Sequence, residues 1–92
     1  MDNIYDVKTR YFTKDNGEKV KLSRLEHKLL IALSNEKLTF YDDISQYLYK
    51  SKYKFTQEGV RGIKKLLIKK TNLNIRAINS RGYILESDVY YM

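Results

Sequence analysis

The segment from residue 57 to residue 71 separates apolar from basic side chains on a helical wheel. Its apolar side carries Val60, Ile63 and Leu67. Its opposite side carries a basic row at every fourth position, Arg61, Lys65 and Lys69. This spacing predicts an α-helix that packs one side against a hydrophobic core and turns the basic row outward. The chain is therefore expected to fold as a globular domain around this helix.

The positive charge of the chain is concentrated around the same helix. The 92 residues carry a formal net charge of +7. Residues 50–81 hold ten lysines and arginines but only one acidic residue, Glu58, whereas residues 1–49 hold eight of each sign. A charge that served only solubility would be spread over the whole surface. Its segregation indicates a polyanionic partner, and nucleic acid is the commonest one for a small domain.

Length and composition exclude several other classes of protein. The length suits a single domain, 1–92, and no cysteine is available for a disulfide, a thiolate metal site or a nucleophile. His27 stands alone, the side chains of Asp42 and Asp43 diverge on a helix, and no glycine-rich phosphate loop occurs. We therefore expect no enzyme, no metal and no cofactor. The longest apolar run, 29–33, is too short to span a membrane, so a cytoplasmic protein is expected.

The first half of the chain predicts a β-hairpin followed by a helix. Residues 4–13 are rich in β-branched and aromatic side chains, and the turn sequence Asp-Asn-Gly separates them from an alternating run at 19–22. Ser23 and Glu26 match the S-x-x-E capping box. A helix over about 24–34 is expected to begin there.

The second half predicts a short strand, two helices and a second hairpin. Residues 38–40 form a short strand or connector, and a helix begins at Asp42. The lysine- and tyrosine-rich loop 50–55 leads to Thr56, a suitable N-cap for the basic helix. The hairpin 75–85 turns at Asn-Ser-Arg-Gly.

This order of elements predicts an α+β fold of the winged helix-turn-helix type. Such a domain has an N-terminal β-hairpin, three helices and a C-terminal β-hairpin wing, with its last helix in the DNA major groove. The core is expected over about 5–86, with 87–92 as a tail. The candidate DNA-binding residues are Lys54, Thr56, Gln57, Arg61, Lys64, Lys65, Lys69, Arg76, Asn79, Arg81 and Tyr83.

Several of these residues have an alternative interpretation. Gln57 can read a base edge or cap the first turn of the helix. Lys64 can contact DNA or extend its ammonium from the edge of the core. Asn79 can serve as a turn residue that tolerates a left-handed backbone. Tyr83 is better suited to packing the wing on the body than to binding phosphate.

Three motifs resemble one known family over roughly residues 5–86. The wing sequence Ile75-Arg-Ala-Ile-Asn-Ser-Arg-Gly-Tyr-Ile-Leu85 is similar to I-x-T-V-R-G-x-G-Y-x-L/F. The helix start Val20-Lys-Leu-Ser-x-x-Glu26-x-x-Leu29-Leu30 is similar to V-x-L-T-x-x-E-x-x-L-L, and residues 60–70 are similar to a recognition helix ending in R-x-K-K-L. These patterns are typical of the OmpR/PhoB-type winged-helix effector domain of bacterial response regulators in two-component systems.

The resemblance implies binding of double-stranded DNA at a promoter by tandem protomers, with loop 50–55 positioned to touch RNA polymerase. The chain departs from the family pattern at Asn79, where the family has arginine, and at Tyr49, where it has tryptophan. Arg81 is a candidate replacement for the arginine that the family has at this position of the wing. No phosphoacceptor receiver domain accompanies the motifs, so the chain is either an effector half or a stand-alone regulator.

Two other functions fit parts of the sequence. A winged-helix module can bind protein and use its lysines for solubility, although the lopsided charge argues against this. An RNA-binding domain could stack unpaired bases on Tyr47, Tyr49, Tyr53 and Tyr83. Sequence-specific binding of duplex DNA in transcription regulation remains the leading hypothesis.

Overall fold

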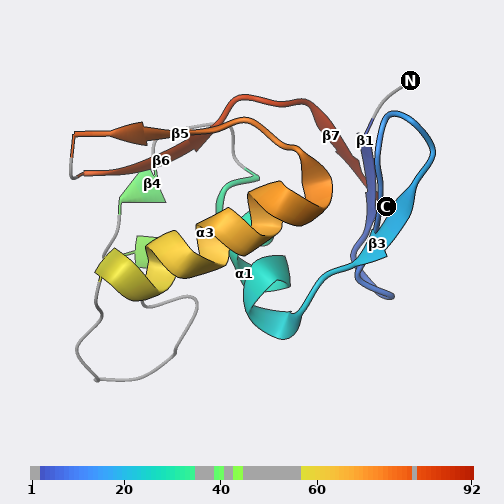
Figure 1. The fold of residues 1–92 in the computed structure, drawn as a ribbon, viewed down its shortest axis with the longest axis horizontal. Helices are drawn as coiled ribbons and strands as arrows, with labels where there is room; N and C mark the ends of the chain where they lie inside the picture. The colour runs from blue at the N-terminus through green and yellow to red at the C-terminus, as the bar shows by residue number, and fades with distance from the viewer. Residues whose placement is uncertain (1–2, 35–38, 41–42, 45–56, 80) are drawn as a thin grey trace.

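The computed structural model of the chain describes residues 3–34, 39–40, 43–44, 57–79 and 81–92 (Figure 1). Helices and strands follow one another along it in the order β1, β2, β3, α1, β4, α3, β5, β6 and β7. Their bounds are β1 Asn3–Asp6, β2 Tyr11–Thr13, β3 Lys19–Lys21, α1 Arg24–Ala32, β4 Thr39–Phe40, α3 Gln57–Thr71, β5 Ile75–Ile78, β6 Gly82–Leu85 and β7 Val89–Tyr91. The described residues therefore form the expected mixed α+β domain.

The N-terminal sheet differs from the predicted hairpin. Residues 4–13 were expected to form one strand, but they form β1 and β2, which pair antiparallel. A turn separates them: the N–H of Arg10 donates to the carbonyl oxygen of Asp6 at 2.8 Å, and Asp6 Oδ1 accepts from the backbone N–H of Lys8 at 3.0 Å. The β-forming side chains favour a strand, but the Asp6 carboxylate stabilises the turn instead. The predicted hairpin itself is formed by β2 and β3.

The expected tail at 87–92 is also wrong. Residues Val89–Tyr91 form β7, which pairs parallel to β1 and completes a sheet of order β3-β2-β1-β7. This pairing joins the two ends of the described chain (Figure 1). A three-residue strand has little local signal, and it is stable here because β1 offers an unpaired edge.

Three helices were expected. Two of them, α1 and α3, lie within the described residues and are observed there. Asp43 and Ile44 are helical, but the rest of the helix expected after Asp42 lies outside the described residues. The hairpin expected over 75–85 is confirmed, because β5 and β6 pair antiparallel. Strand β4 pairs with β6 and makes this a three-stranded sheet of order β4-β6-β5.

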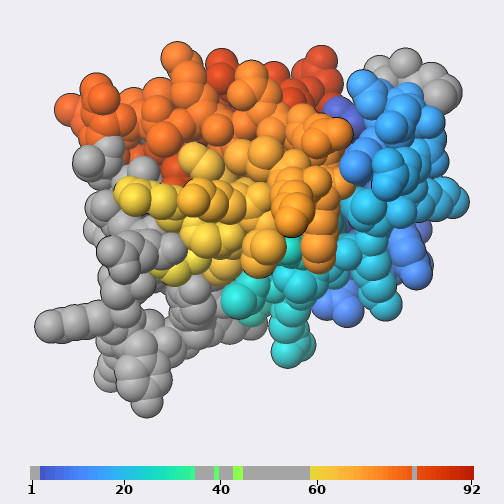
Figure 2. Space-filling model, in the orientation of Figure 1, coloured from blue at the N-terminus to red at the C-terminus, as the bar shows by residue number. Residues whose placement is uncertain are grey.

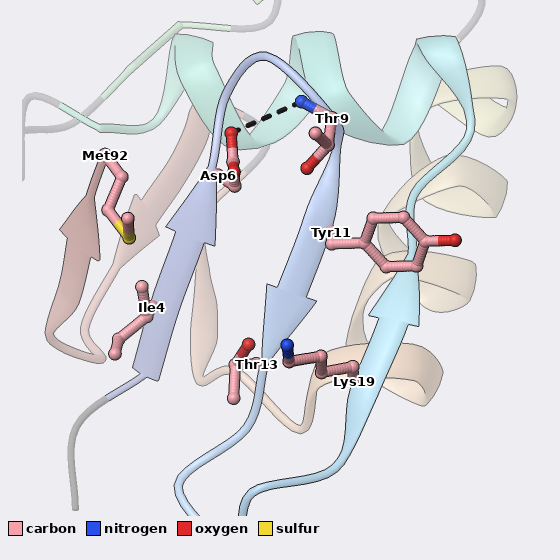
Figure 3. Close-up of a pocket in the computed structure, with 7 residues that line it drawn as sticks. All are labelled: Ile4, Asp6, Thr9, Tyr11, Thr13, Lys19 and Met92. Carbon is pink, nitrogen blue, oxygen red and sulfur yellow. Dashed lines mark hydrogen bonds between the residues drawn. The ribbon is translucent and has the colours of Figure 1, made fainter.

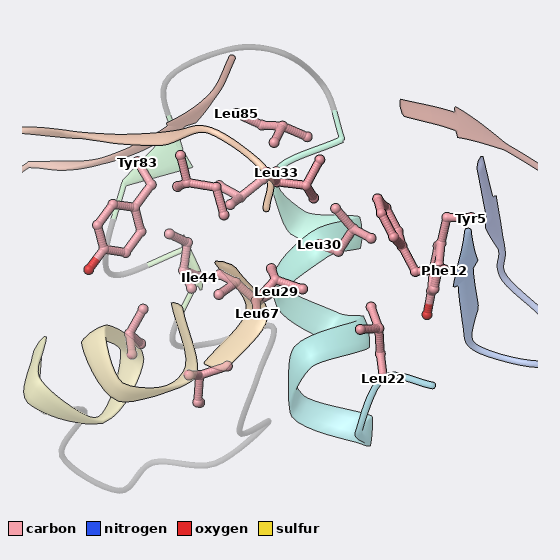
Figure 4. Packing of buried hydrophobic residues seen from close by; sticks show 14 residues of the cluster. Tyr5, Phe12, Leu22, Leu29, Leu30, Leu33, Ile44, Leu67, Tyr83 and Leu85 are labelled. Carbon is pink, nitrogen blue, oxygen red and sulfur yellow. The ribbon is translucent and has the colours of Figure 1, made fainter. Parts of the chain in front are cut away.

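The hydrophobic core lies between the helices and the two sheets (Figure 4). Tyr5 and Phe12 from the N-terminal sheet pack toward α1, and Leu29 and Leu30 of α1 are fully buried. Leu67 of α3 is fully buried in the same cluster. The apolar side predicted for α3 is therefore the side that packs into the core.

An ion pair with a buried carboxylate fixes α3 against the start of α1. The capping box predicted from Ser23 and Glu26 is present, with Glu26 Oε1 accepting from the Ser23 N–H at 2.7 Å. The same oxygen accepts from Lys70 Nζ at 2.7 Å, and the Glu26 side chain is only 2% exposed. Burial raises the pKa of Glu26, but the hydrogen bonds from Lys70 and Ser23 outweigh it and leave the pKa lowered. The last turn of α3 is thus joined to the first turn of α1.

The lowered pKa of Glu26 predicts a loss of stability in acid. Because the folded pKa lies below the unfolded value, near 4.5, Glu26 contributes stability above that value. This contribution is lost as the pH falls through the folded pKa. Urea unfolding between pH 6 and about pH 3 is expected to show a smaller decrease in the free energy of unfolding for Glu26→Gln than for the unmodified chain. Parallel pH profiles for the two proteins would contradict this expectation.

Candidate nucleic-acid interface

The basic row of α3 lies on the surface, as its spacing predicted. Arg61, Lys65 and Lys69 are exposed. Of the apolar residues of the same helix, Leu66 is 53% exposed and three others are buried. These buried residues are Val60, Ile63 and Leu67. Figure 2 shows α3, coloured yellow to orange, across the front of the molecule, with the β5–β6 hairpin above it. The helix therefore presents three cations on a convex, solvent-facing surface.

Lys64 connects α3 to the wing. Its ammonium lies 4.6 Å from the centroid of the Tyr83 ring, a cation–π contact, and its side chain is half-buried. Burial lowers the pKa of Lys64, and the neighbouring charges of Arg61 and Lys65 lower it further. Of the two interpretations open for Lys64, the geometry agrees with an ammonium held at the edge of the core.

Tyr83 is a packing residue rather than a surface ligand. It is 2% exposed and belongs to the hydrophobic core. Its assignment as a DNA-binding residue therefore does not agree with its burial, whereas its role in packing the wing on the body does. The reason is its place in β6, the central strand of the three-stranded sheet.

The turn of the wing is exposed and carries one cation at its tip. Arg81 is exposed, and its N–H donates to the carbonyl oxygen of Ile78 at 2.7 Å. Asn79 has a φ of 29°, so it serves as the turn residue that its alternative interpretation described. Arg76 is exposed too, but its Nε lies 3.3 Å from Glu86 Oε1. The turn lies at the end of the molecule where α3 begins (Figure 1).

The side chains of three predicted DNA-binding residues lie outside the described part of the chain. Lys54 and Thr56 lie outside the described residues, as does the whole of loop 50–55. Gln57 is the first residue of α3, but its side chain lies outside the described part.

The exposed cations of α3 and the wing tip have no carboxylate partner among the described side chains. Within the described part of the chain, none of the ion pairs includes Arg61, Lys65, Lys69 or Arg81. Like charges on one surface repel each other until an anion neutralises them. The surface formed by Arg61, Lys65, Lys69 and Arg81, which we call the α3–wing surface, is suited to an extended polyanion.

The fold can now be compared with known proteins. No protein-family model and no curated protein matches the chain. Among solved structures, the chain is similar to the crystal structure of the DNA-binding domain of CssR from Bacillus subtilis. The TM-score is 0.76 at 23% sequence identity, over 85% of this chain and 92% of that one. The chain has the winged-helix fold. The similarity to that DNA-binding domain agrees with the fold that the resemblance in the motifs predicted.

The order of elements in the winged-helix fold shows which part of it α3 corresponds to. Helix α3 is the last helix before the wing, which is the position of the recognition helix in this architecture.

No helix in the described part is long and apolar enough to cross a membrane. Among the same residues, no group of three or more histidines and carboxylates is arranged to hold a metal ion.

Proposed function

We propose that this winged-helix domain binds double-stranded DNA sequence-specifically as a transcription regulator. Helix α3 enters the major groove, and the turn of the wing lies at the adjacent minor groove. The observation that carries this proposal is the exposed row of Arg61, Lys65 and Lys69, opposite the buried side of the same helix.

The dimensions of the row suit duplex DNA. Eight residues separate Arg61 from Lys69, which corresponds to about 12 Å along a helix at about 1.5 Å per residue. A major groove about 12 Å wide admits an α-helix, and arginine and lysine reach guanine edges and phosphates there. Arg81 extends from a narrow hairpin, a shape that suits a minor groove with concentrated negative potential.

Promoter recognition by tandem protomers extends the same proposal. The outer face of the N-terminal sheet, which faces away from α1, exposes Tyr11 (45%) and Met92 (67%) beside Ile4 (Figure 3). These exposed apolar side chains are suited to contact a second copy bound to an adjacent site. Loop 50–55 remains the candidate contact for RNA polymerase, and the helix beginning at Asp42 would complete the helix-turn-helix.

Titration of fluorescent duplex DNA with the chain over a salt series tests the proposal. Because each neutralised phosphate contributes a slope of about −0.9 to log K against log salt, several phosphate contacts should give a steep dependence. A duplex carrying the operator should bind more tightly than one of scrambled sequence. An affinity that barely changes with salt would overturn the proposal. Stronger binding of single-stranded RNA in competition would favour the RNA-binding alternative.

A further inference from the structure

A second concentration of positive charge lies away from the α3–wing surface. The turn between β1 and β2 and the first half of α1 enclose a depression of about 570 Å³. It is lined by Val7, Lys8, Arg10, Arg24, His27 and Lys28. Four of these side chains are cationic and none is acidic. The β1–β2 turn lies toward the end of the molecule opposite the wing turn (Figure 1). We call these six residues the N-terminal basic depression.

Arg10 is held in place by the backbone around it. Its φ of 64° lies in the left-handed region, which disfavours residues other than glycine, asparagine and aspartate. Its N–H donates to the carbonyl oxygen of Asp6, and its own carbonyl oxygen accepts from the N–H of Leu22, both at 2.8 Å. These two bonds fix an arginine at the point where the sheet meets the start of α1. A residue in a disfavoured conformation at a concave surface is a common feature of binding sites.

Two acidic residues adjoin the lining residues in the sequence, Asp6 and Glu26, and neither lines the depression. Asp6 Oδ1 accepts from the N–H groups of Lys8 and Thr9, and Asp6 lines a separate depression on the outer face of the sheet (Figure 3). Glu26 is paired with Lys70. Within the described part of the chain, the ion pairs include none of Lys8, Arg10 and Arg24. These three cations therefore lie around one depression, and an anion would relieve their mutual repulsion.

His27 lines the same depression beside these charges. A hydrogen bond joins its Nδ1 to the Tyr5 hydroxyl. Burial raises the pKa of Tyr5 to about 12, so this hydroxyl keeps its proton at neutral pH. Burial, followed by the charges of Arg10 and Lys28, lowers the pKa of His27, which favours a neutral ring. A neutral imidazole has one donor and one acceptor nitrogen, so the tautomer in which Nδ1 accepts from Tyr5 carries its ring proton on Nε2.

We propose that the N-terminal basic depression binds a small anion with two or more phosphate groups, separately from DNA. Arginine guanidinium groups donate two parallel hydrogen bonds to phosphate oxygens, and lysines add point charge. Its volume lies within the roughly 300–1,000 Å³ that is usual for small-molecule sites. The shared chemistry is the phosphate group, which a free polyphosphate or the DNA backbone can supply. The position of the depression away from the wing favours the free ligand.

Isothermal titration calorimetry of the intact chain with pyrophosphate tests this site. One pyrophosphate is expected to bind per chain. Arg10→Asn, which retains a residue suited to a left-handed backbone, and Arg24→Ala, at an exposed helical position, are each expected to weaken binding about tenfold, since each removes a charge-assisted hydrogen bond. Lys19→Ala removes the same charge from outside the depression and is the matched control. Equal weakening by the three variants, or no stoichiometric binding, would overturn the site.

Two further measurements separate the sources of phosphate. Pyrophosphate should raise the pKa of His27, followed through its ring protons by NMR, because the anion offsets the charges of Arg10 and Lys28. Arg10→Asn should reduce this rise. The affinity of Arg10→Asn for duplex DNA should equal that of the unmodified chain. A loss of DNA affinity in Arg10→Asn beyond that in Lys19→Ala would overturn the separate site and assign the depression to DNA phosphate. This result is independent of whether α3 binds DNA.

Discussion

Replacing Arg61, Lys65 and Lys69 together with alanine is expected to weaken duplex DNA binding by about 100-fold or more at about 0.1 M salt. The three side chains are exposed on α3 and unpaired by carboxylates within the described residues. If all three contact phosphates, the slope of log K against log salt should become shallower by about 2.7, because each lost contact removes about 0.9. Fluorescence anisotropy over a salt series measures both quantities.

A matched triple variant separates this effect from the loss of net charge. Lys14→Ala, Lys19→Ala and Lys21→Ala together remove three charges from the β2–β3 hairpin and its turn, at the other end of the molecule from the wing turn. This control should retain most of the affinity. Circular dichroism confirms that both variants are folded. If both triple variants lose the same affinity, the α3–wing surface is not the DNA-binding surface.

Replacing Lys70 with alanine is expected to destabilise the fold by about 2–3 kcal/mol, because it leaves the Glu26 carboxylate buried without its cation. The Lys70 Nζ–Glu26 Oε1 distance is 2.7 Å, and the Glu26 side chain is 2% exposed while that of Lys70 is 38% exposed. For a domain of this size, that loss corresponds to a melting temperature lower by about 10–20 °C. Thermal unfolding followed by circular dichroism measures it.

The adjacent residue provides the control for Lys70. Lys69→Ala removes the same charge from an exposed position and should change stability by no more than about 0.5 kcal/mol. Adding Glu26→Gln to Lys70→Ala should restore part of the stability, because a neutral amide needs no cation and can still accept from Ser23. Equal melting temperatures for Lys69→Ala and Lys70→Ala would show that the ion pair contributes little.

Elements with a local cause were predicted well from the sequence. Helix α3 has the predicted bounds, because its apolar and basic residues follow the period of an α-helix over fifteen positions. The capping box depends on two side chains three residues apart, and the wing turn depends on four consecutive residues. Each pattern acts within a few residues, so it is readable without knowledge of the rest of the chain.

Contacts between distant segments were not predictable in this way. The turn at Asp6 divides a run that is typical of one strand. Strand β7 is stabilised by its pairing with β1 and by the packing of Val89 and Tyr91 against the core. The sequence does not distinguish Lys70 from the other lysines of α3, and only the fold shows that it pairs with Glu26. The sequence does not reveal the N-terminal basic depression either. Residues 1–49 carry no net charge, and the cations of the depression come from two separate segments.

The sequence by itself determined that one helix has a buried side and an outward basic row, and that a short hairpin with Arg81 follows it. Those features depend on backbone periodicity and turn chemistry, which are properties of neighbouring residues. Only the tertiary structure decided which cations remain available. It placed Lys64 over Tyr83, Arg76 beside Glu86 and Lys70 on Glu26, and it left the α3 row exposed. The physical reason is that a charge is neutralised by side chains that folding brings near it. The order of residues does not specify the distance between two side chains that are far apart in the sequence.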